Sequence, residues 1–129
     1  PGDALAVLPG TVREVDTRDH LMAVETAFGA LWCGAAAGVG EKVRILIAAR
    51  EVSLGREVDV ASSILNQMPA VVESIAEAAP GQCIVTLRAP GAPAERLLAL
   101  LTARSCRQLA LVPGTLIIAR VKGANVSAA

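Results

Sequence analysis

The sequence predicts an all-β protein made of two small antiparallel barrels in tandem, with one short helix in the second half. The 129-residue chain is 53% hydrophobic but only 2% aromatic, so its core must consist mainly of valine, leucine, isoleucine and alanine. Small branched side chains of this kind favour strands. The apolar runs are short and evenly spaced, with turn signals between them, as is typical of small barrels.

An internal repeat divides the chain into two halves, which we expect at residues 1–58 and 59–129. Each half opens with an apolar residue, a proline and an alternating strand, at residues 8–15 and again 60 residues later at residues 68–75. Each half also closes with a glycine-led strand that reaches a Val-Ser pair twelve residues after the glycine, from Gly40 to Val52 and from Gly114 to Val126. The second half has about fourteen more residues between these landmarks, and we expect them to form a loop and the helix.

The positions of strands and turns are predicted from the alternation of apolar and polar residues and from the positions of glycine and proline. Turns are expected at Asp16-Thr17-Arg18-Asp19, Pro80-Gly81 and Pro90-Gly91-Ala92-Pro93. Either Thr102 or Ser105 would cap a helix that runs through Arg107 to Leu111 and ends before Pro113-Gly114. Strands are expected at residues 11–15, 22–26, 30–33, 43–47, 71–75, 83–88 and 95–101.

Charge and cysteine content exclude several function classes. Twelve basic and twelve acidic residues give no net charge and no long run of like charge. The chain has only two aromatic residues that could stack on bases, Phe28 and Trp32, so we expect no nucleic-acid partner. Three widely spaced cysteines, Cys33, Cys83 and Cys106, indicate neither a disulfide framework nor a zinc site and fit a reducing cytosol. The lone His20 is expected to be a solvated turn residue rather than a metal ligand.

We expect no catalytic residues in this fragment. It contains no Gly-x-x-x-x-Gly-Lys-Ser/Thr phosphate loop, no Ser/His/Asp set and no carboxylate cluster. Arg50 and Glu51 are interpreted as an exposed ion pair rather than a catalytic pair. We expect no membrane span and no leader, because no apolar run is long enough to span a bilayer and the first residues lack a charged-then-apolar pattern. The start at Pro1-Gly2 rather than Met suggests a domain of a longer polypeptide.

Three segments together offer the groups that a tetrahedral dianion needs. Residues 62–68 and 102–105 supply hydroxyls, and residues 118–122 end in Lys122. An ion such as molybdate or sulfate accepts hydrogen bonds and donates none, so hydroxyls, backbone amides near Ser63 and one lysine form a suitable set. These segments predict a module that holds a small oxyanion.

The same segments resemble the Mop/TOBE domains of molybdate handling, and most closely the C-terminal regulatory region of the ATP-binding subunit of molybdate ABC transporters, over nearly the whole chain. The family segment Ser-(Ala/Ile)-Arg-Asn is matched by Ser63-Ile64-Leu65-Asn66, with leucine in place of arginine. Thr102-Ala103-Arg104-Ser105 matches Thr-x-x-Ser in full, and the closing strand keeps Lys122 but has Gly123 and Ala124 in place of hydroxyl residues. Residues 50–54 resemble the Arg-Asp-Val-Ser-Leu signature of the transporter ATPases, which argues against a free-standing storage protein.

The resemblance implies OB-fold-like TOBE/Mop barrels and an oxyanion site for molybdate or tungstate, with no metal and no covalent cofactor. The expected site residues are Ser63, Ile64, Leu65, Thr102, Ser105, Lys122 and Gly123. Each donor lost at positions 65, 123 and 124 would weaken binding by about 1.5–3 kcal/mol. The first half is expected not to bind, because Asp3 and Ala48 align with Ser63 and Lys122.

The resemblance also implies a cellular setting. A regulatory, oxyanion-sensing domain of this kind would form a homodimer with the anion at or near the contact between the two copies. It would adjoin a parent ATPase domain, where ATP binds, and a membrane permease subunit, at the cytoplasmic face of the cell membrane. Two alternatives stay open: a non-binding structural or dimerisation TOBE domain of an ABC transporter for another substrate, and a stand-alone molybdate-storage protein.

Overall fold

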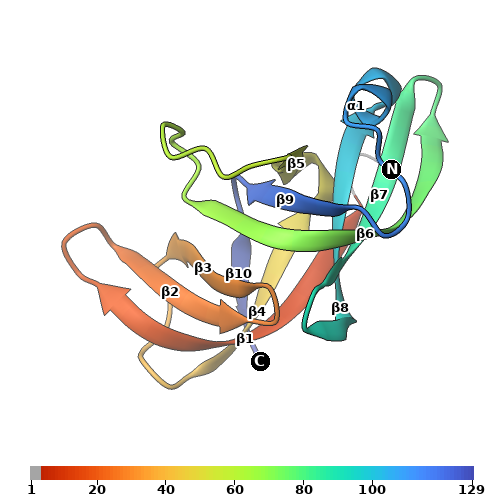
Figure 1. The fold of residues 1–129 in the computed structure, drawn as a ribbon. Coiled ribbons are helices and arrows are strands. Elements are labelled where there is room, and N and C mark those ends of the chain that lie inside the picture. The colour runs from red at the N-terminus through yellow and green to blue at the C-terminus, as the bar shows by residue number, and fades with distance from the viewer. Residues whose placement is uncertain (1–3) are drawn as a thin grey trace.

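The computed structural model describes residues 4–129, which form two five-stranded antiparallel sheets, one α-helix and one 3-10 turn (Figure 1). The all-β prediction with one short helix in the second half is confirmed. One sheet has the order β10-β4-β1-β2-β3 and the other the order β5-β9-β6-β7-β8. Their strands are β1 (Leu5–Asp16), β2 (Leu21–Thr26), β3 (Gly29–Gly34), β4 (Lys42–Ala48), β5 (Val52–Gly55), β6 (Asn66–Ala79), β7 (Gln82–Ala89), β8 (Ala92–Thr102), β9 (Leu116–Val121) and β10 (Asn125–Ala128).

The internal repeat is preserved in the pairing of the strands. Strand β1 pairs with β4 so that Pro9 lies opposite Arg44, and β6 pairs with β9 so that Pro69 lies opposite Ile118. Both prolines precede the point where the second neighbour, β2 or β7, begins to pair, so neither has to donate a hydrogen bond to that neighbour. The register shifts just after Val12 in β1 and just after Val72 in β6.

The two sheets exchange their last strands. Strand β5, from the first half of the sequence, pairs with β9, whereas β10, from the end of the chain, pairs with β4. Each sheet therefore contains four strands from one half and one strand from the other. The boundary expected between residues 58 and 59 falls in the segment that joins β5 to β6 and stays a prediction.

One hydrophobic core runs through both sheets, and it is aliphatic, as the composition predicted. Strand β8 contacts β1, β5 and the 3-10 turn η1 (Ala49–Glu51), which joins the two sheets. Phe28 is the buried aromatic residue of this core. The largest fully buried side chains are those of Leu8, Met22, Leu31, Ile45, Ile47, Leu87, Leu97 and Ile117.

Helix α1 spans Ala103–Gln108 and is shorter than the sequence suggested. Thr102 caps it, because its Oγ1 accepts the backbone N–H of Ser105 at 3.0 Å. Of the two predicted caps Thr102 is therefore correct, and the predicted extension to Leu111 is wrong. Ala110 takes a left-handed conformation with φ 52°, and the N–H groups of Ala110 and Leu111 bond back to Arg107 and Cys106 at 3.0 and 3.1 Å, which closes the helix as a Schellman motif.

The turns are close to those expected. The Asp16 carboxylate accepts the N–H of Asp19 at 3.0 Å, and His20 is exposed at the end of this turn, as predicted. Pro80-Gly81 forms a turn, but the turn predicted over residues 90–93 is confined to Pro90-Gly91, because β8 already begins at Ala92. No helix within residues 4–129 is both long and apolar enough to cross a membrane.

Candidate functional site

Five of the seven predicted site residues line one cavity of about 370 Å³. They are Ser63, Ile64, Leu65, Lys122 and Gly123. The remaining lining comes from Asn66, Ala124, Leu21 and the end of β3, Trp32 to Gly34. Segments that lie about 60 residues apart in the sequence are thus brought together where β6 begins and β9 ends, since Asn66 lies opposite Val121 in the sheet.

Asn66 fixes the wall of this cavity. Its side chain is buried, at 7% exposure, and its amide accepts the Trp32 N–H at 2.7 Å while donating to the Trp32 carbonyl at 2.8 Å. A longer bond of 3.5 Å reaches the carbonyl of Val121. The Asn66 amide therefore makes the hydrogen bonds that the backbone of a neighbouring strand would make. It joins β3 to the start of β6 and the end of β9, the two segments that line the cavity. This role was not predicted, because the sequence shows only that Asn66 ends the segment Ser63-Ile64-Leu65-Asn66 and not what its side chain contacts.

Gln67 and Arg120 shape the segment that leads into the cavity. The Gln67 amide donates to the carbonyls of Asp59 and Ile64 at 2.7 and 3.1 Å and accepts the N–H of Asp59 at 2.7 Å. The Arg120 guanidinium donates to the carbonyl of Glu57 at 2.6 Å. These bonds hold residues 57–64 as an ordered arm beside the cavity.

The donors in the cavity are few. Lys122 is exposed, and within residues 4–129 its ammonium makes no ion pair or hydrogen bond; the Ser63 hydroxyl is likewise exposed and unbonded there. The backbone N–H of Ile64, one of the amides expected to bind an anion, instead donates to Ser62 Oγ at 3.0 Å. One lysine, one hydroxyl and an otherwise mainly apolar wall therefore remain on this side.

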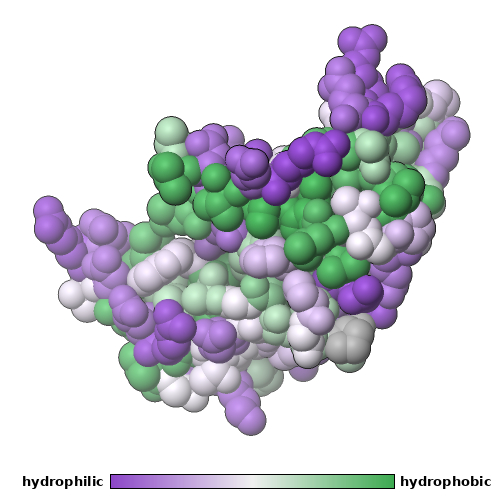
Figure 2. Space-filling model, in the orientation of Figure 1, coloured by the Kyte–Doolittle hydropathy of each residue, from purple (hydrophilic) through white to green (hydrophobic). Residues whose placement is uncertain are grey.

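Exposed apolar side chains lie at and beside this cavity: Leu65 lines it, and Val60 lines an adjoining cavity that also contains Ile64 and Leu65. Leu65, which replaces the arginine of the family segment, is 63% exposed, and Val60 on the neighbouring arm is 95% exposed. Figure 2 shows apolar surface over this part of the molecule, in the upper left of the view, where the segment between β5 and β6 lies. Exposed apolar groups that lie together in this way are typical of an interaction surface.

Thr102 and Ser105 do not line the cavity. Thr102 lies opposite Gln82, and Gln82 lies opposite Ala79, the last residue of β6, whereas the cavity is at the first residue of β6. In Figure 1, α1 accordingly lies at the far end of the sheet from the start of β6. Thr102 Oγ1 and Ser105 Oγ bond to each other at 2.9 Å. The seven predicted residues therefore form two groups within one copy of the chain.

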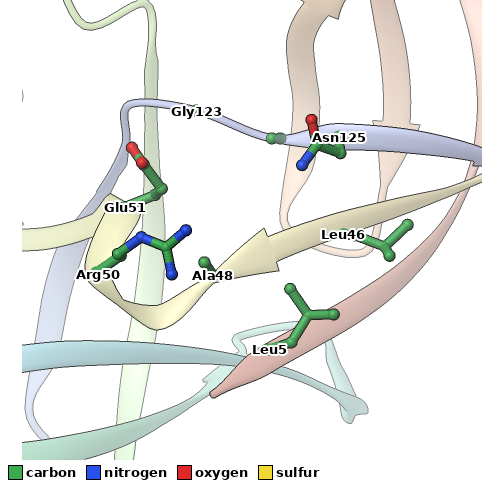
Figure 3. Close-up of a pocket in the computed structure, with 8 residues that line it drawn as sticks. Leu5, Leu46, Ala48, Arg50, Glu51, Gly123 and Asn125 are labelled. Atoms are coloured by element: carbon green, nitrogen blue, oxygen red, sulfur yellow. The ribbon is translucent and has the colours of Figure 1, made fainter. Parts of the chain in front are cut away.

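A second cavity, of about 420 Å³, occupies the corresponding place in the first half (Figure 3). It contains Leu5 and Ala48, the repeat counterparts of Leu65 and Lys122, together with Arg50 and Glu51. Gly123 and Ala124 line both cavities. Ala48 provides no charge, as expected from the alignment, and Asp3, the counterpart of Ser63, lies outside the described residues.

Two cysteine thiols, those of Cys33 and Cys106, have a raised pKa. Burial raises the pKa of Cys33, which lines the 370 Å³ cavity. Burial, and then the adjacent Cys83 thiol, raise the pKa of Cys106 to about 11. Thiols held neutral in this way are poor ligands and nucleophiles. Within residues 4–129, no three His, Cys, Asp or Glu side chains are close enough together to hold a metal ion.

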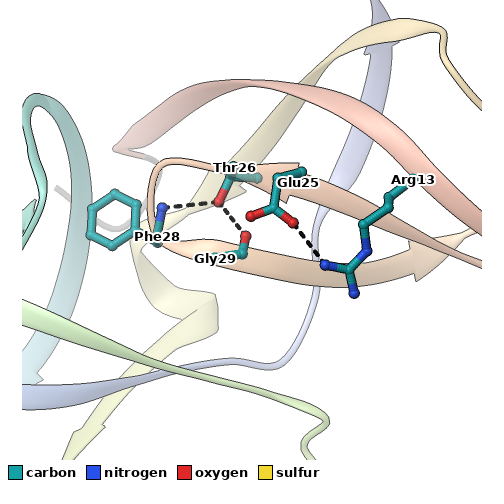
Figure 4. A network of polar contacts seen from close by, with 5 residues as sticks. All are labelled: Arg13, Glu25, Thr26, Phe28 and Gly29. Atoms are coloured by element: carbon teal, nitrogen blue, oxygen red, sulfur yellow. Dashed lines mark hydrogen bonds and ion pairs between the residues drawn. The ribbon is translucent and has the colours of Figure 1, made fainter.

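Another polar network, at the β2–β3 hairpin, is structural (Figure 4). Thr26 Oγ1 accepts the Phe28 N–H at 3.1 Å and donates to the Gly29 carbonyl at 2.8 Å, which closes the turn. Arg13 and Glu25 form a 3.0 Å ion pair, but both side chains are about half exposed. Such surface pairs contribute little free energy.

Comparison with known proteins gives relatives for nearly the whole chain. It is 38% identical over 122 residues to the molybdenum import ATP-binding protein ModC of Albidiferax ferrireducens, and 40% identical over 122 residues to that of Aromatoleum aromaticum. These alignments cover 94% of the chain but 32% of either relative, so the chain spans about a third of the curated relatives' length.

A solved structure shares the fold. The cytoplasmic molybdate-binding protein ModG, solved with molybdate bound, superposes with a TM-score of 0.76 over 95% of both chains, at 20% sequence identity. This likeness supports the tandem arrangement of Mop/TOBE-type barrels. The TOBE domain family model matches residues 62–128, the stretch that includes Lys122, helix α1, β9 and β10. On this match the chain belongs to the TOBE domain family.

Proposed function

We propose that this chain is a regulatory, oxyanion-sensing domain of a molybdate ABC transporter's ATP-binding subunit, with molybdate or tungstate as its ligand. The observation that carries the proposal is the convergence of Ser63, Leu65, Lys122 and Gly123 on one cavity. An ammonium without an internal partner attracts an anion, and a bond from a charged donor contributes about 1.5–3 kcal/mol. The named ModC relatives support the transporter setting.

A second copy of the chain would complete the site. Lys122 and Ser63 offer too few donors to satisfy the four oxygens of a tetrahedral dianion, and burying such an ion without partners is costly. The Thr102 and Ser105 hydroxyls are at the other end of β6 and cannot reach the same cavity within one copy. In an isologous dimer, the α1 end of one copy would face the Lys122 cavity of the other, and the exposed Leu65 and Val60 would be covered.

The first test is calorimetric titration of the chain with molybdate, with sulfate as a competing oxyanion. Trp32 is the only tryptophan and lines the cavity, so its fluorescence gives a second, local signal. We expect a dissociation constant in the micromolar range or tighter. Lys122→Ala should weaken binding by about 10- to 150-fold. The matched control is Lys42→Ala, because Lys42 is exposed on β4 and is the only other lysine.

Equal binding by wild type and Lys122→Ala would refute the site. A dimer that forms but takes up no molybdate would favour the alternative of a structural dimerisation domain. Leu65 is the observation that favours this alternative, because it supplies no donor where the family has arginine.

A separate experiment tests whether Lys122 of one copy and Ser105 of the other form one oxyanion site. Lys122→Ala and Ser105→Ala each damage both sites of a dimer, but a mixed dimer of the two variants has one site with Lys122 and Ser105 intact. Mixing the two weak binders should therefore restore tight binding at about a quarter of all sites. No restoration would show that the site lies within one copy.

The transporter setting implies inhibition of a parent ATPase. Molybdate bound at the cytoplasmic side would stabilise the closed regulatory dimer and reduce transport. A complete subunit carrying Lys122→Ala should then hydrolyse ATP at the uninhibited rate in molybdate concentrations that slow the wild type. A natural polypeptide that contains this chain but no ATPase domain, and that binds molybdate, would instead support the storage-protein alternative.

A further inference from the structure

Glu51 lies behind the wall of the Lys122 cavity, although sequence comparison places it in the first half and outside the oxyanion site. It ends the 3-10 turn η1 and is half-buried. Its backbone carbonyl accepts the N–H of Lys122 at 2.9 Å. This bond holds the turn directly against the segment that carries the site lysine.

The carboxylate of Glu51 packs on Gly123. A Cβ atom placed at position 123 would come 3.2 Å from Glu51 Oε2 and 3.4 Å from Cδ. Figure 3 shows the carboxylate extending toward Gly123, whereas the Arg50 guanidinium extends toward Ala48. Because Gly123 lines both cavities, a thin backbone wall without a side chain separates this negative charge from the space in which an anion would sit.

We propose that Glu51 is a specificity-determining residue of the oxyanion site, and that its charge lowers the affinity for tetrahedral dianions more than for tetrahedral monoanions. The inference rests on the proposed function and deepens it. Gly123 allows the close approach, because a Cβ atom at this position would require the end of the Glu51 side chain to move by a few tenths of an ångström. The bound anion would then be attracted by Lys122, which lines its cavity, and repelled by Glu51 on the other side of Gly123.

The ratio of the two effects follows from Coulomb's law. The repulsion between the Glu51 carboxylate and a bound anion is proportional to the charge of the anion, so its free energy is twice as large for a dianion as for a monoanion of the same shape. The factor in affinity for the monoanion is therefore the square root of the factor for the dianion, for example about threefold beside about tenfold. A merely structural role for Glu51 would affect both anions by the same factor.

The experiment compares Glu51→Gln with wild type at low ionic strength, where charge effects are least screened. Molybdate serves as the dianion and is titrated directly, and perrhenate serves as the monoanion and is measured by competition with molybdate. We expect Glu51→Gln to bind molybdate about tenfold and perrhenate about threefold more tightly. Glu77→Gln is the matched control, since Glu77 is exposed on β6 and its loss changes the net charge equally.

The outcomes separate the two proposals. Equal factors for the two anions, no change, or weaker binding by Glu51→Gln would overturn the role of Glu51 and leave the oxyanion site intact. A gain of the same size in Glu77→Gln would also overturn it, because the effect would then come from net charge alone. If neither wild type nor Glu51→Gln binds molybdate, the proposed function itself fails, and the role of Glu51 fails with it.

Discussion

Replacing Asn66 with alanine would remove the amide that joins β3 to the start of β6. The two short bonds to the Trp32 backbone, at 2.7 and 2.8 Å, would be lost together. The Trp32 N–H and carbonyl would then lack partners, and each buried group left in this way costs about 1–3 kcal/mol. Trp32 is only half-buried, so water can replace part of the loss. We expect the free energy of unfolding to fall by about 3 kcal/mol.

Urea denaturation followed by Trp32 fluorescence and by circular dichroism measures this change. With a slope of about 1.5–2 kcal/mol per molar urea, the midpoint should fall by roughly 1.5–2 M. The matched control is Asn125→Ala, because Asn125 is exposed on β10, and we expect it to stay within about 0.5 kcal/mol of wild type. A loss below about 0.5 kcal/mol for Asn66→Ala would refute the argument that this amide holds the site segments together.

Two further substitutions test other features. Ala110→Gly should raise the free energy of unfolding by about 0.5–1 kcal/mol in the same urea assay, because φ 52° is strained for alanine and free for glycine; an unchanged or lower value would contradict the Schellman closure. In wild type, the unfolded Cys106 thiol should ionise near pH 9.0 and the folded one only near pH 11, so stability should fall as the pH rises across this window. Cys106→Ala should show a flatter pH profile in thermal unfolding, and identical profiles would mean that the thiol is not desolvated.

Much of the fold could be predicted, because alternation shows directly which residues face the core. The 60-residue spacing of Leu8 and Met68 also predicted two equivalent strands. These are β1 and β6, and each has a register shift at the equivalent position, just after Val12 and just after Val72. The exchange of β5 and β10 could not be predicted. Periodicity determines the buried face of a strand but not its partner, and short segments such as residues 52–55 can pair with either sheet.

The candidate site was predictable only in part. The segments that supply Ser63 and Lys122 were identified and meet at one cavity, but spacing in the sequence gave no indication that Thr102 and Ser105 are at the other end of β6. Asn66 and Glu51 act through contacts across the sheets, with Trp32 and with Gly123. Contacts between distant segments leave no local pattern, so neither residue could be assigned from the sequence.

The exchanged strands also bear on the order of synthesis. The last strand of the sheet that contains β1 to β4 is β10, Asn125–Ala128, which pairs with β4. In the other sheet, β5 (Val52–Gly55) is synthesised more than sixty residues before its partner β9. On the ribosome, β4 must therefore wait with one edge uncovered until β10 has left the exit tunnel. During that interval the exposed edge can pair with another nascent chain, so slow translation of the codons between β4 and β10 should increase aggregation.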